Sequence, residues 1–258
     1  MQIKKIVDFL LNKYPLKNKE IWDPSGFSVK FNQREKIKGV VLAIDLTNEV
    51  LEKAIDLDAN LIITHHPFKF EQKWSDEKIK APYKENIRNK LKEKRISVIS
   101  FHTNYDNDEN GTSHEIAKQL GLDSFIVKYD SNYPCLLNVN ISFNEIVNLF
   151  KNKLGFSAFR SNLPKEHFNR LFSKIAILSG SGYITEVNKL NFEKTDLIIT
   201  SDIKWSDWIV YKETNASILE VPHLDEQVFM EKFEELLKNE FNDLKITKVY
   251  LKEPYYNL

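Results

Sequence analysis

Three clusters of histidine and acidic residues contain the side-chain types that bind divalent metal ions. They include four of the six histidines of the sequence. Imidazole and carboxylate groups are ligands of ions such as Zn²⁺, Fe²⁺, Mn²⁺ and Co²⁺. The single cysteine, Cys135, excludes a cage of thiolates, so a metal here would take its ligands from histidine, aspartate and glutamate. The clusters are His65-His66, His102 with Thr103, Asn104 and Asp106, and His223 with Asp225 and Glu226.

The number of these groups favours two metal ions rather than one. Four or five ligands exceed what one open catalytic zinc ion needs, and a carboxylate can bridge two ions. We therefore expect two divalent ions about 3.5–4 Å apart. Such a pair lowers the pKa of a bound water molecule and polarises an electrophile, which is the chemistry of a hydrolase. Asp45 could orient a ligand histidine by a hydrogen bond, or it could be an ordinary acid at the start of a helix.

Each histidine taken alone has a structural alternative. A histidine after a strand is more often a turn or core residue than a ligand, and in the pair His65-His66 one could bind metal while the other packs. His114, in a possible helix cap, and His167, in a polar stretch, fit structural roles. The occurrence of three clusters at equivalent positions is what favours a shared metal site.

The elements that would position these clusters are strands of a parallel sheet. Apolar, β-branched runs predict strands at 38–46, 60–64, 96–101 and 217–221, and a cluster directly follows each of the last three. Thr47 is a plausible N-cap of a helix that follows the first run. Alternating strands and helices are typical of an α/β fold. Because ligands bind outside the carboxyl ends of parallel strands, we expect the clusters to converge there.

An internal repeat indicates two similar halves. Residues 60–66 (NLIITHH) are echoed by residues 196–202 (DLIITSD), each after an apolar strand and a helix. We therefore predict two similar α/β lobes, the first formed by 1–130 plus 222–258 and the second by 131–221, with the metal site at the C-terminal ends of strands between the lobes. Further predictions are helices over 80–94 and 225–238, strands over 136–140 and 174–178, and helix-capping boxes at 112–115 and 142–145.

Two glycine-containing motifs carry weaker signals. Ser179-Gly-Ser-Gly182 could cradle an anion at a helix N-terminus or could be a plain tight turn, and it lacks the lysine and spacing of a P-loop. Trp22-Asp-Pro-Ser-Gly26 is predicted to be a turn because of its proline and glycine.

Composition restricts the class of protein. The 258 residues carry 37 basic and 37 acidic side chains, and this zero net charge gives no electrostatic footprint for nucleic acid or an anionic membrane. No stretch of about 18 apolar residues could span a bilayer, and the N-terminus has no secretory pattern. With a single cysteine, the sequence favours a cytoplasmic protein.

The motifs together resemble the NIF-three-like family, whose bacterial members are often labelled GTP cyclohydrolase I type 2 homologs. The resemblance runs in family order over nearly the whole chain, and its His-His-Pro and His-Thr-x-x-Asp segments are the most specific. The segments that carry it are 22–27 (WDPSGF), 43–50, 59–67 (ANLIITHHP), 102–106 (HTNYD), 179–182, 199–204 and His223.

The resemblance implies a toroidal homohexamer of two-lobed subunits, each with a dinuclear metal centre. It implies that His65, His66, Asp106 and His223 are metal ligands, with Asp106 bridging. The family's fifth ligand is a glutamate four residues after the last histidine, where this sequence has Gln227; Glu226 stands one residue earlier. Either Glu226 replaces it or the site has lost its second carboxylate.

The leading hypothesis is a metal-dependent hydrolase that acts on a small nucleotide-like or heterocyclic substrate, with Glu226 or His102 transferring the proton. The cyclohydrolase activity is implied only by the resemblance. The alternative is a non-catalytic, metal-binding hexameric scaffold or regulatory protein, which the glutamine at position 227 favours. A small-molecule substrate is the expected partner, and no nucleic acid or membrane is expected.

Overall fold

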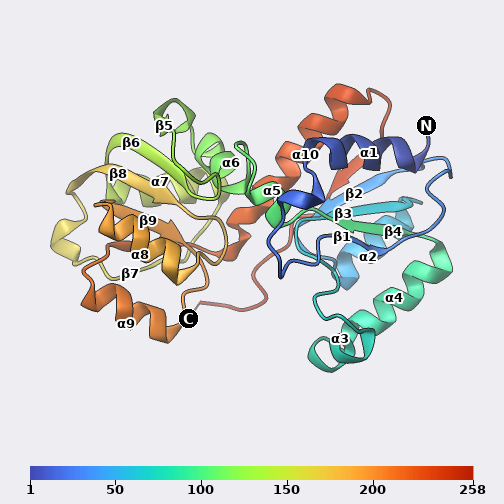
Figure 1. The fold of residues 1–258 in the computed structure, drawn as a ribbon, viewed down its shortest axis with the longest axis horizontal. Helices are drawn as coiled ribbons and strands as arrows, with labels where there is room; N and C mark the ends of the chain where they lie inside the picture. Colours follow the sequence, from blue (N-terminus) through green and yellow to red (C-terminus); the bar gives the residue numbers. More distant parts are fainter. Residues whose placement is uncertain (258) are drawn as a thin grey trace. The chain divides into compact units, whose positions relative to one another are not determined.

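The computed structural model describes residues 1–257, and the chain divides into two compact units (Figure 1). The first unit comprises Met1–Asn107 and Phe229–Leu251, and the second comprises Asp108–Val228 together with the C-terminal tail. The lobes at 1–130 plus 222–258 and at 131–221 stay a prediction from the sequence. Residues 112–120 pack on the sheet of the second unit.

The first unit is built on a five-stranded, mostly parallel sheet with strand order β1-β4-β3-β2-β11. Three parallel neighbours, β2, β3 and β4, form its centre, and β1 pairs with β4 in the antiparallel direction. β11 pairs in parallel with β2 at the other edge. The strands are β1 (Gly26–Val29), β2 (Val40–Ala43), β3 (Leu61–Thr64), β4 (Ser97–Ser100) and β11 (Ile246–Lys248).

Helices cover both faces of this sheet, which explains why its central strands are apolar throughout (Figure 1). Alternate side chains of a strand face opposite sides, so Leu42 packs with α1 and α10 while Val41 packs with α2 and α4. The helix predicted over 80–94 is α4, which begins at Tyr83, directly after Pro82; α3, which was not predicted, ends at Lys80. The helices are α1 (Ile3–Lys13), α2 (Asn48–Asp56), α3 (Trp74–Lys80), α4 (Tyr83–Lys94), the short α5 (Thr103–Asp106) and α10 (Val228–Glu240).

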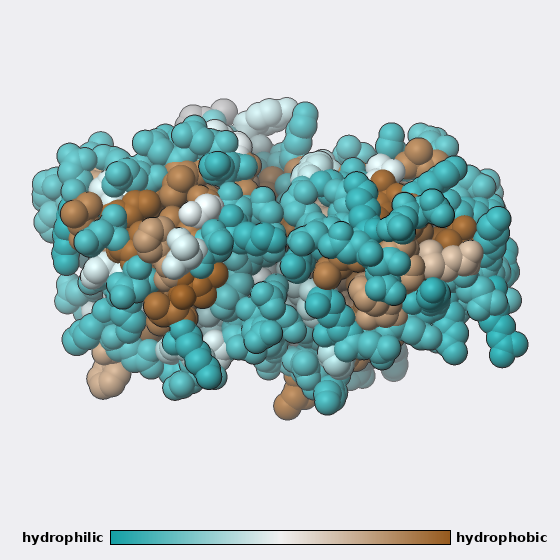
Figure 2. Space-filling model, turned by 90° about the horizontal axis from the view of Figure 1, so that it is seen from above, coloured by the Kyte–Doolittle hydropathy of each residue, from teal (hydrophilic) through white to brown (hydrophobic). Residues whose placement is uncertain are grey.

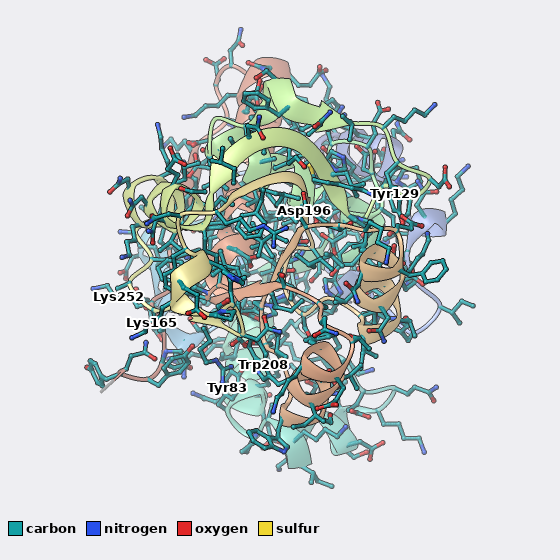
Figure 3. The ribbon with its side chains drawn as sticks, turned by 90° about the vertical axis from the view of Figure 1, so that its left-hand side faces the viewer. Tyr83, Tyr129, Lys165, Asp196, Trp208 and Lys252 are labelled. Atoms are coloured by element: carbon teal, nitrogen blue, oxygen red, sulfur yellow. The ribbon has the colours of Figure 1, made fainter. Side chains whose placement is uncertain are left out.

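The second unit contains a six-stranded mixed sheet with strand order β5-β6-β8-β9-β10-β7. Its parallel centre is β8-β9-β10, while β6 and β7 pair in the antiparallel direction. Asp196, labelled in Figure 3, fixes the start of β9 because its carboxylate accepts hydrogen bonds from the backbone N–H groups of Ser173 and Lys174 on β8. The strands are β5 (Ile126–Val127), β6 (Cys135–Ser142), β7 (Arg160–Ser161), β8 (Leu171–Ile177), β9 (Leu197–Thr200) and β10 (Ile218–Glu220).

Helices also cover both faces of the second sheet. α6 (Thr112–Gln119) and α7 (Phe143–Leu154) pack on one face, and α8 (Ile184–Phe192) and α9 (Trp205–Glu213) pack on the other. The capping box at Ser142 is confirmed, since its side chain and that of Glu145 each accept the other's backbone N–H. The box predicted at 112–115 is wrong: α6 begins at Thr112 itself, with Gly111 as N-cap and no side-chain cap.

The predicted repeat corresponds to equivalent strands. The LIIT sequences form β3 and β9, and each is the middle one of three consecutive parallel strands in its sheet. The sequence prediction of two similar α/β lobes is confirmed. Four strands were not predicted: β1 and β11, at the edges of the first sheet, and the two-residue β5 and β7, at the edges of the second.

The face seen in Figure 2 is mostly hydrophilic, with separate smaller hydrophobic areas. Scattered exposed apolar residues are ordinary on soluble domains, so exposure alone identifies no site. Among the helices of residues 1–257, none combines the length and the apolar character that a membrane crossing requires.

Candidate metal centre

His65 and His66 directly follow the central strand β3. Their backbone N–H groups continue the hydrogen bonding between β3 and its neighbour β2. The backbone N–H of His65 donates to Ala43 O at 3.2 Å, and that of His66 donates to Ile44 O at 2.9 Å. The Thr64 hydroxyl donates to His66 O at 2.8 Å. His65 is fully buried, and the side chain of His66 is 14% exposed. The sheet therefore fixes the backbone of both histidines.

The imidazoles of His65 and His66 have the same hydrogen-bonding pattern. Nδ1 of His65 lies 3.0 Å from the carbonyl oxygen of Phe101, and Nδ1 of His66 lies 3.0 Å from Oδ2 of Asp45. A carbonyl and a carboxylate can only accept, so each Nδ1 carries the proton in the neutral ring and each Nε2 keeps its lone pair. This arrangement is typical of histidines that bind metal through Nε2. It also places Asp45 in the orienting role that was one of its two predicted alternatives.

His102 and Asp106 come from the end of the neighbouring strand β4. His102 precedes α5, and its backbone carbonyl accepts the N–H of Asp106 at 3.0 Å. Asp106 is 5% exposed, and its Oδ1 lies 3.7 Å from Nε2 of His65. The imidazole of His102 lies edge-on to those of His65 and His66, with centroid distances of 5.1 and 5.4 Å. Clusters separated by 36 residues in the sequence therefore meet within the first unit.

These residues fit a divalent ion. One ring nitrogen from each of His65, His66 and His102 lies within 4.8 Å of those of the other two. Three imidazoles with a buried carboxylate beside them form a donor set suited to Zn²⁺, Fe²⁺, Mn²⁺ or Co²⁺. The sequence hypothesis gave His102 a role in proton transfer, whereas the geometry also makes it a possible ligand.

Asp23 is a site residue that the sequence interpretation missed. It is 2% exposed, and its carboxylate accepts hydrogen bonds from the backbone N–H groups of Ser25 and Thr103 at 2.9 and 3.0 Å. Its Oδ1 also lies 3.4 Å from Nδ1 of His102. Burial raises the pKa of Asp23, but the side chain of His102 and hydrogen bonds from the hydroxyl groups of Thr103 and Ser25 outweigh burial and lower the pKa overall. The predicted turn at 22–26 therefore also holds the loop that begins at His102.

The second unit has its own histidine–carboxylate cluster, which follows β10. Nε2 of His223 lies 2.9 Å from Oε2 of Glu226, and its Nδ1 lies 2.8 Å from Oδ2 of Asp202. Burial lowers the pKa of His223, but the carboxylates of Glu226 and Asp202 raise it to about 12. The ring is then a cation between two anions, so a metal ion bound at Nε2 would replace a proton.

Glu226, rather than Gln227, is the carboxylate beside His223. Glu226 is 4% exposed and lies with Asp225 in the 3₁₀ helix His223–Gln227. Burial raises the pKa of Asp225 and the neighbouring Glu226 carboxylate raises it further, which is expected where two acids share a buried site. Two carboxylates and an imidazole so close together are another donor set for a cation.

The Ser179–Gly182 segment is a structural turn in this unit. The N–H of Ser179 donates to Ser113 Oγ at 2.9 Å, and that of Gly182 donates to Thr200 Oγ1 at 2.8 Å. Because side chains of the protein already accept these two amides, the geometry favours the plain tight turn over the anion cradle. Gly180 has a φ of +57°, and a Cβ there would overlap the carboxylate of Glu226. Its glycine is therefore needed for the position of Glu226.

The structure thus brings the predicted residues together in two groups. His65, His66, His102 and Asp106 lie together in the first unit, and His223 and Glu226 lie together in the second.

Comparison with known proteins agrees with the resemblance. Residues 1–254 match the family described as Duf34/NIF3 (NGG1p interacting factor 3). A GTP cyclohydrolase 1 type 2 homolog of Mycoplasmopsis pulmonis is 40% identical over 234 residues, covering 90% of this chain and 91% of that protein. A GTP cyclohydrolase 1 type 2 homolog of Ureaplasma parvum is 33% identical, covering 96% of this chain and 94% of that protein.

Solved structures share the fold. The hypothetical protein SA1388 of Staphylococcus aureus has a TM-score of 0.88 at 24% identity, covering 100% of this chain and 99% of that one. Reduced HcgD from Methanocaldococcus jannaschii has a TM-score of 0.81 at 24% identity, covering 97% and 98%. Both the sequence match and the shared fold extend over nearly the whole chain. The chain belongs to the Duf34/NIF3 (NGG1p interacting factor 3) family.

Proposed function

We propose that this chain binds two divalent metal ions and is a metal-dependent hydrolase of a small nucleotide-like or heterocyclic substrate. The observation that carries the proposal is the common orientation of His65, His66 and His102. Their Nδ1 atoms face, in that order, oxygens of Phe101, Asp45 and Asp23. The Nε2 atoms therefore keep the lone pairs that could bind a metal ion.

The ligands of the proposed ions are the residues of the two clusters. His65, His66 and Asp106 would hold metal in the first, and His223 and Glu226 in the second. The family resemblance implies that these ions would form one dinuclear centre, with Asp106 as the shared ligand. Divalent ions would supply Lewis acidity and lower the pKa of a coordinated water molecule.

Two residues are proposed to transfer protons. His102 is 13% exposed and has Asp23 at Nδ1, so its Nε2 can accept or donate a proton at the surface of the site. Glu226 already shares a hydrogen bond with His223 and is the second candidate. The relatives named GTP cyclohydrolase 1 type 2 homologs support a purine nucleotide as the first substrate to test.

A non-catalytic metal-binding scaffold or regulatory protein is the second candidate function. Gln227 favours it, because the family resemblance implies a glutamate at that position. Glu226 beside His223 favours the hydrolase, because it restores a carboxylate.

We further propose that the chain assembles as a homohexamer in the cytoplasm. The family resemblance supports the hexamer. The reduced, buried Cys135 is compatible with a reducing compartment. Light scattering on the purified protein would measure the mass of the assembly directly.

Metal analysis combined with a substrate screen tests the proposed function. We expect two ions per chain in the wild type, and loss of at least one in Asp106→Asn and in His66→Gln, with Asp58→Asn as an exposed control. Hydrolysis of GTP, other nucleotides or phosphodiesters with Mn²⁺, Zn²⁺ or Fe²⁺ should disappear in the same two variants. Two bound ions without turnover of any substrate would favour the scaffold. Turnover that persists in Asp106→Asn would contradict the hydrolase mechanism.

A further inference from the structure

Two exposed aromatic rings lie beside the histidine cluster of the first unit. Trp22 is 53% exposed and Phe70 is 45% exposed. Both are set edge-to-face against the imidazole of His102, with centroid distances of 5.7 and 6.3 Å and interplanar angles of 75° and 85°. They come from segments separated by more than forty residues, before β1 and after His66. The rings therefore meet at one of the candidate metal-binding imidazoles.

The loop that carries Trp22 is fixed by buried groups. The next residue, Asp23, accepts hydrogen bonds from Ser25 and Thr103, and the N–H of Glu20 donates to the hydroxyl of Thr103 at 2.9 Å. These contacts hold the backbone on both sides of the indole. The exposure of Trp22 is therefore a property of an ordered loop.

The loop that carries Phe70 is fixed in the same way by a different acid. Glu77 is 3% exposed, and its Oε2 accepts the N–H groups of Phe70 and Glu71 at 2.8 and 2.7 Å. Lys84 pairs with the other oxygen of Glu77 at 2.6 Å, and its ammonium group lies 5.8 Å from the centre of the Phe70 ring. A buried carboxylate thus fixes the backbone beside each aromatic ring.

We propose that Trp22 and Phe70 form a stacking subsite for the flat ring of a nitrogen heterocycle that reacts at the histidine cluster. The inference rests on the proposed function and adds the residues that recognise the flat ring of the substrate. Aromatic side chains supply a large apolar contact area, and they lose little conformational entropy because they have only two rotatable bonds. Every nucleobase can stack on them because each has a flat π-face. A ligand with a flat apolar face and a polar edge matches rings that border imidazoles and carboxylates.

An aliphatic or lipid ligand matches the surroundings less well. The polar groups near the rings include the imidazole of His102, the Asp23 carboxylate beside it and the Lys84 ammonium group beside Phe70. An alkyl chain offers these polar groups no hydrogen bond, whereas the ring nitrogens and exocyclic groups of a heterocycle can form hydrogen bonds. A contact between two copies of the chain is the other use of exposed aromatic rings, and the experiment separates it.

Ligand binding to tryptophan variants tests the subsite. The probes are guanosine, adenosine and pterin, with ribose as a control that lacks the flat ring, titrated to millimolar concentration by calorimetry. Trp22→Ala should weaken binding of the heterocycles roughly 5- to 150-fold, the range of base–aromatic stacking losses, and Phe70→Ala should weaken it in the same direction. Trp22→Phe should retain most of the affinity. Trp205→Ala removes a more exposed indole, 79% exposed, from the second unit and should leave binding unchanged.

Metal content and mass, measured on the same samples, distinguish the possible failures. Trp22→Ala should keep the wild-type number of ions and the wild-type assembly. If the wild type binds no metal but binds heterocycles through Trp22, the proposed function fails and the subsite stands. The subsite is overturned if none of the three heterocycles binds, or if Trp22→Ala binds them as the wild type does. It is also overturned if that variant changes only the mass of the assembly, since the rings would then form a contact between copies.

Discussion

Asp45 Oδ2 lies 3.0 Å from Nδ1 of His66, so a carboxylate at the end of one strand orients an imidazole at the end of its neighbour. The pair is 49% exposed at Asp45 and 14% at His66, so its direct contribution to stability is small. Its importance is orientational: it fixes the tautomer and directs Nε2 of His66 toward the cluster.

Replacing Asp45 therefore should weaken metal binding more than it weakens the fold. We expect Asp45→Asn to lower the affinity for Zn²⁺ about 10- to 100-fold, the usual effect of removing the partner of a ligand histidine. The control is Asp58→Asn, an exposed carboxylate of the same unit that pairs with Lys38. Competition with a chromophoric chelator measures both affinities. Equal affinities in the two variants would show that Asp45 does not orient a ligand.

Gly180 should be required for the position of Glu226. In Gly180→Ala the new methyl group would overlap the Glu226 carboxylate, so we expect loss of metal at the His223 cluster. Gly121→Ala is a matched control, because Gly121 also has positive φ, +78°, but has nothing within 4 Å of the added Cβ. Both variants should lose about 1 kcal/mol of stability from backbone strain.

Metal content per chain and thermal unfolding separate these two effects. Only Gly180→Ala should lose an ion. If both glycine variants keep their full metal content, Glu226 does not depend on this turn.

The buried pair of Glu77 and Lys84 should make stability depend on pH. Burial raises the pKa of Glu77, but the N–H of Glu71, Lys84 and the N–H of Phe70 outweigh burial and lower the pKa. A lowered pKa in the folded state contributes stability above the unfolded value, about 4.3, and this stability is lost as the pH falls through the folded value. We expect Glu77→Gln to lower the free energy of unfolding at neutral pH by about 2–4 kcal/mol.

Urea unfolding at several pH values measures this dependence. Between about pH 5 and about pH 3, the free energy of unfolding should fall less steeply in Glu77→Gln than in the wild type. The control is Glu85→Gln, which removes an exposed pair with Lys78 and should follow the wild-type curve. Parallel curves for Glu77→Gln and the wild type would contradict the assignment.

The centre of each sheet could be predicted from the sequence because its residues are apolar on both faces. Leu61–Thr64 and Leu197–Thr200 are recognisable as buried parallel strands without any knowledge of their partners. The edge strand Ile246–Lys248 is half-buried and short, so its pairing with β2 depends on contacts distant in the sequence. The Thr112–Glu115 motif matched a capping box, yet Thr112 is buried inside the helix, a choice made by tertiary packing.

The ligand candidates could be predicted because each directly follows a strand that is itself predictable. Asp23 could not, because its partners Thr103 and His102 lie about eighty residues away and a turn motif contains no signal of such contacts. Trp22 and Phe70 are similar: their proximity to His102 follows from the fold and not from spacing along the chain.

Anomalous diffraction from crystals of the wild-type protein grown with Mn²⁺, measured at the manganese edge, tests the central claim most directly. The account predicts anomalous peaks within coordination distance of Nε2 of His65 and of His66, and of Nε2 of His223. Absence of any peak at these nitrogens, or a peak beside Nδ1 where Phe101 O and Asp45 lie, would contradict it.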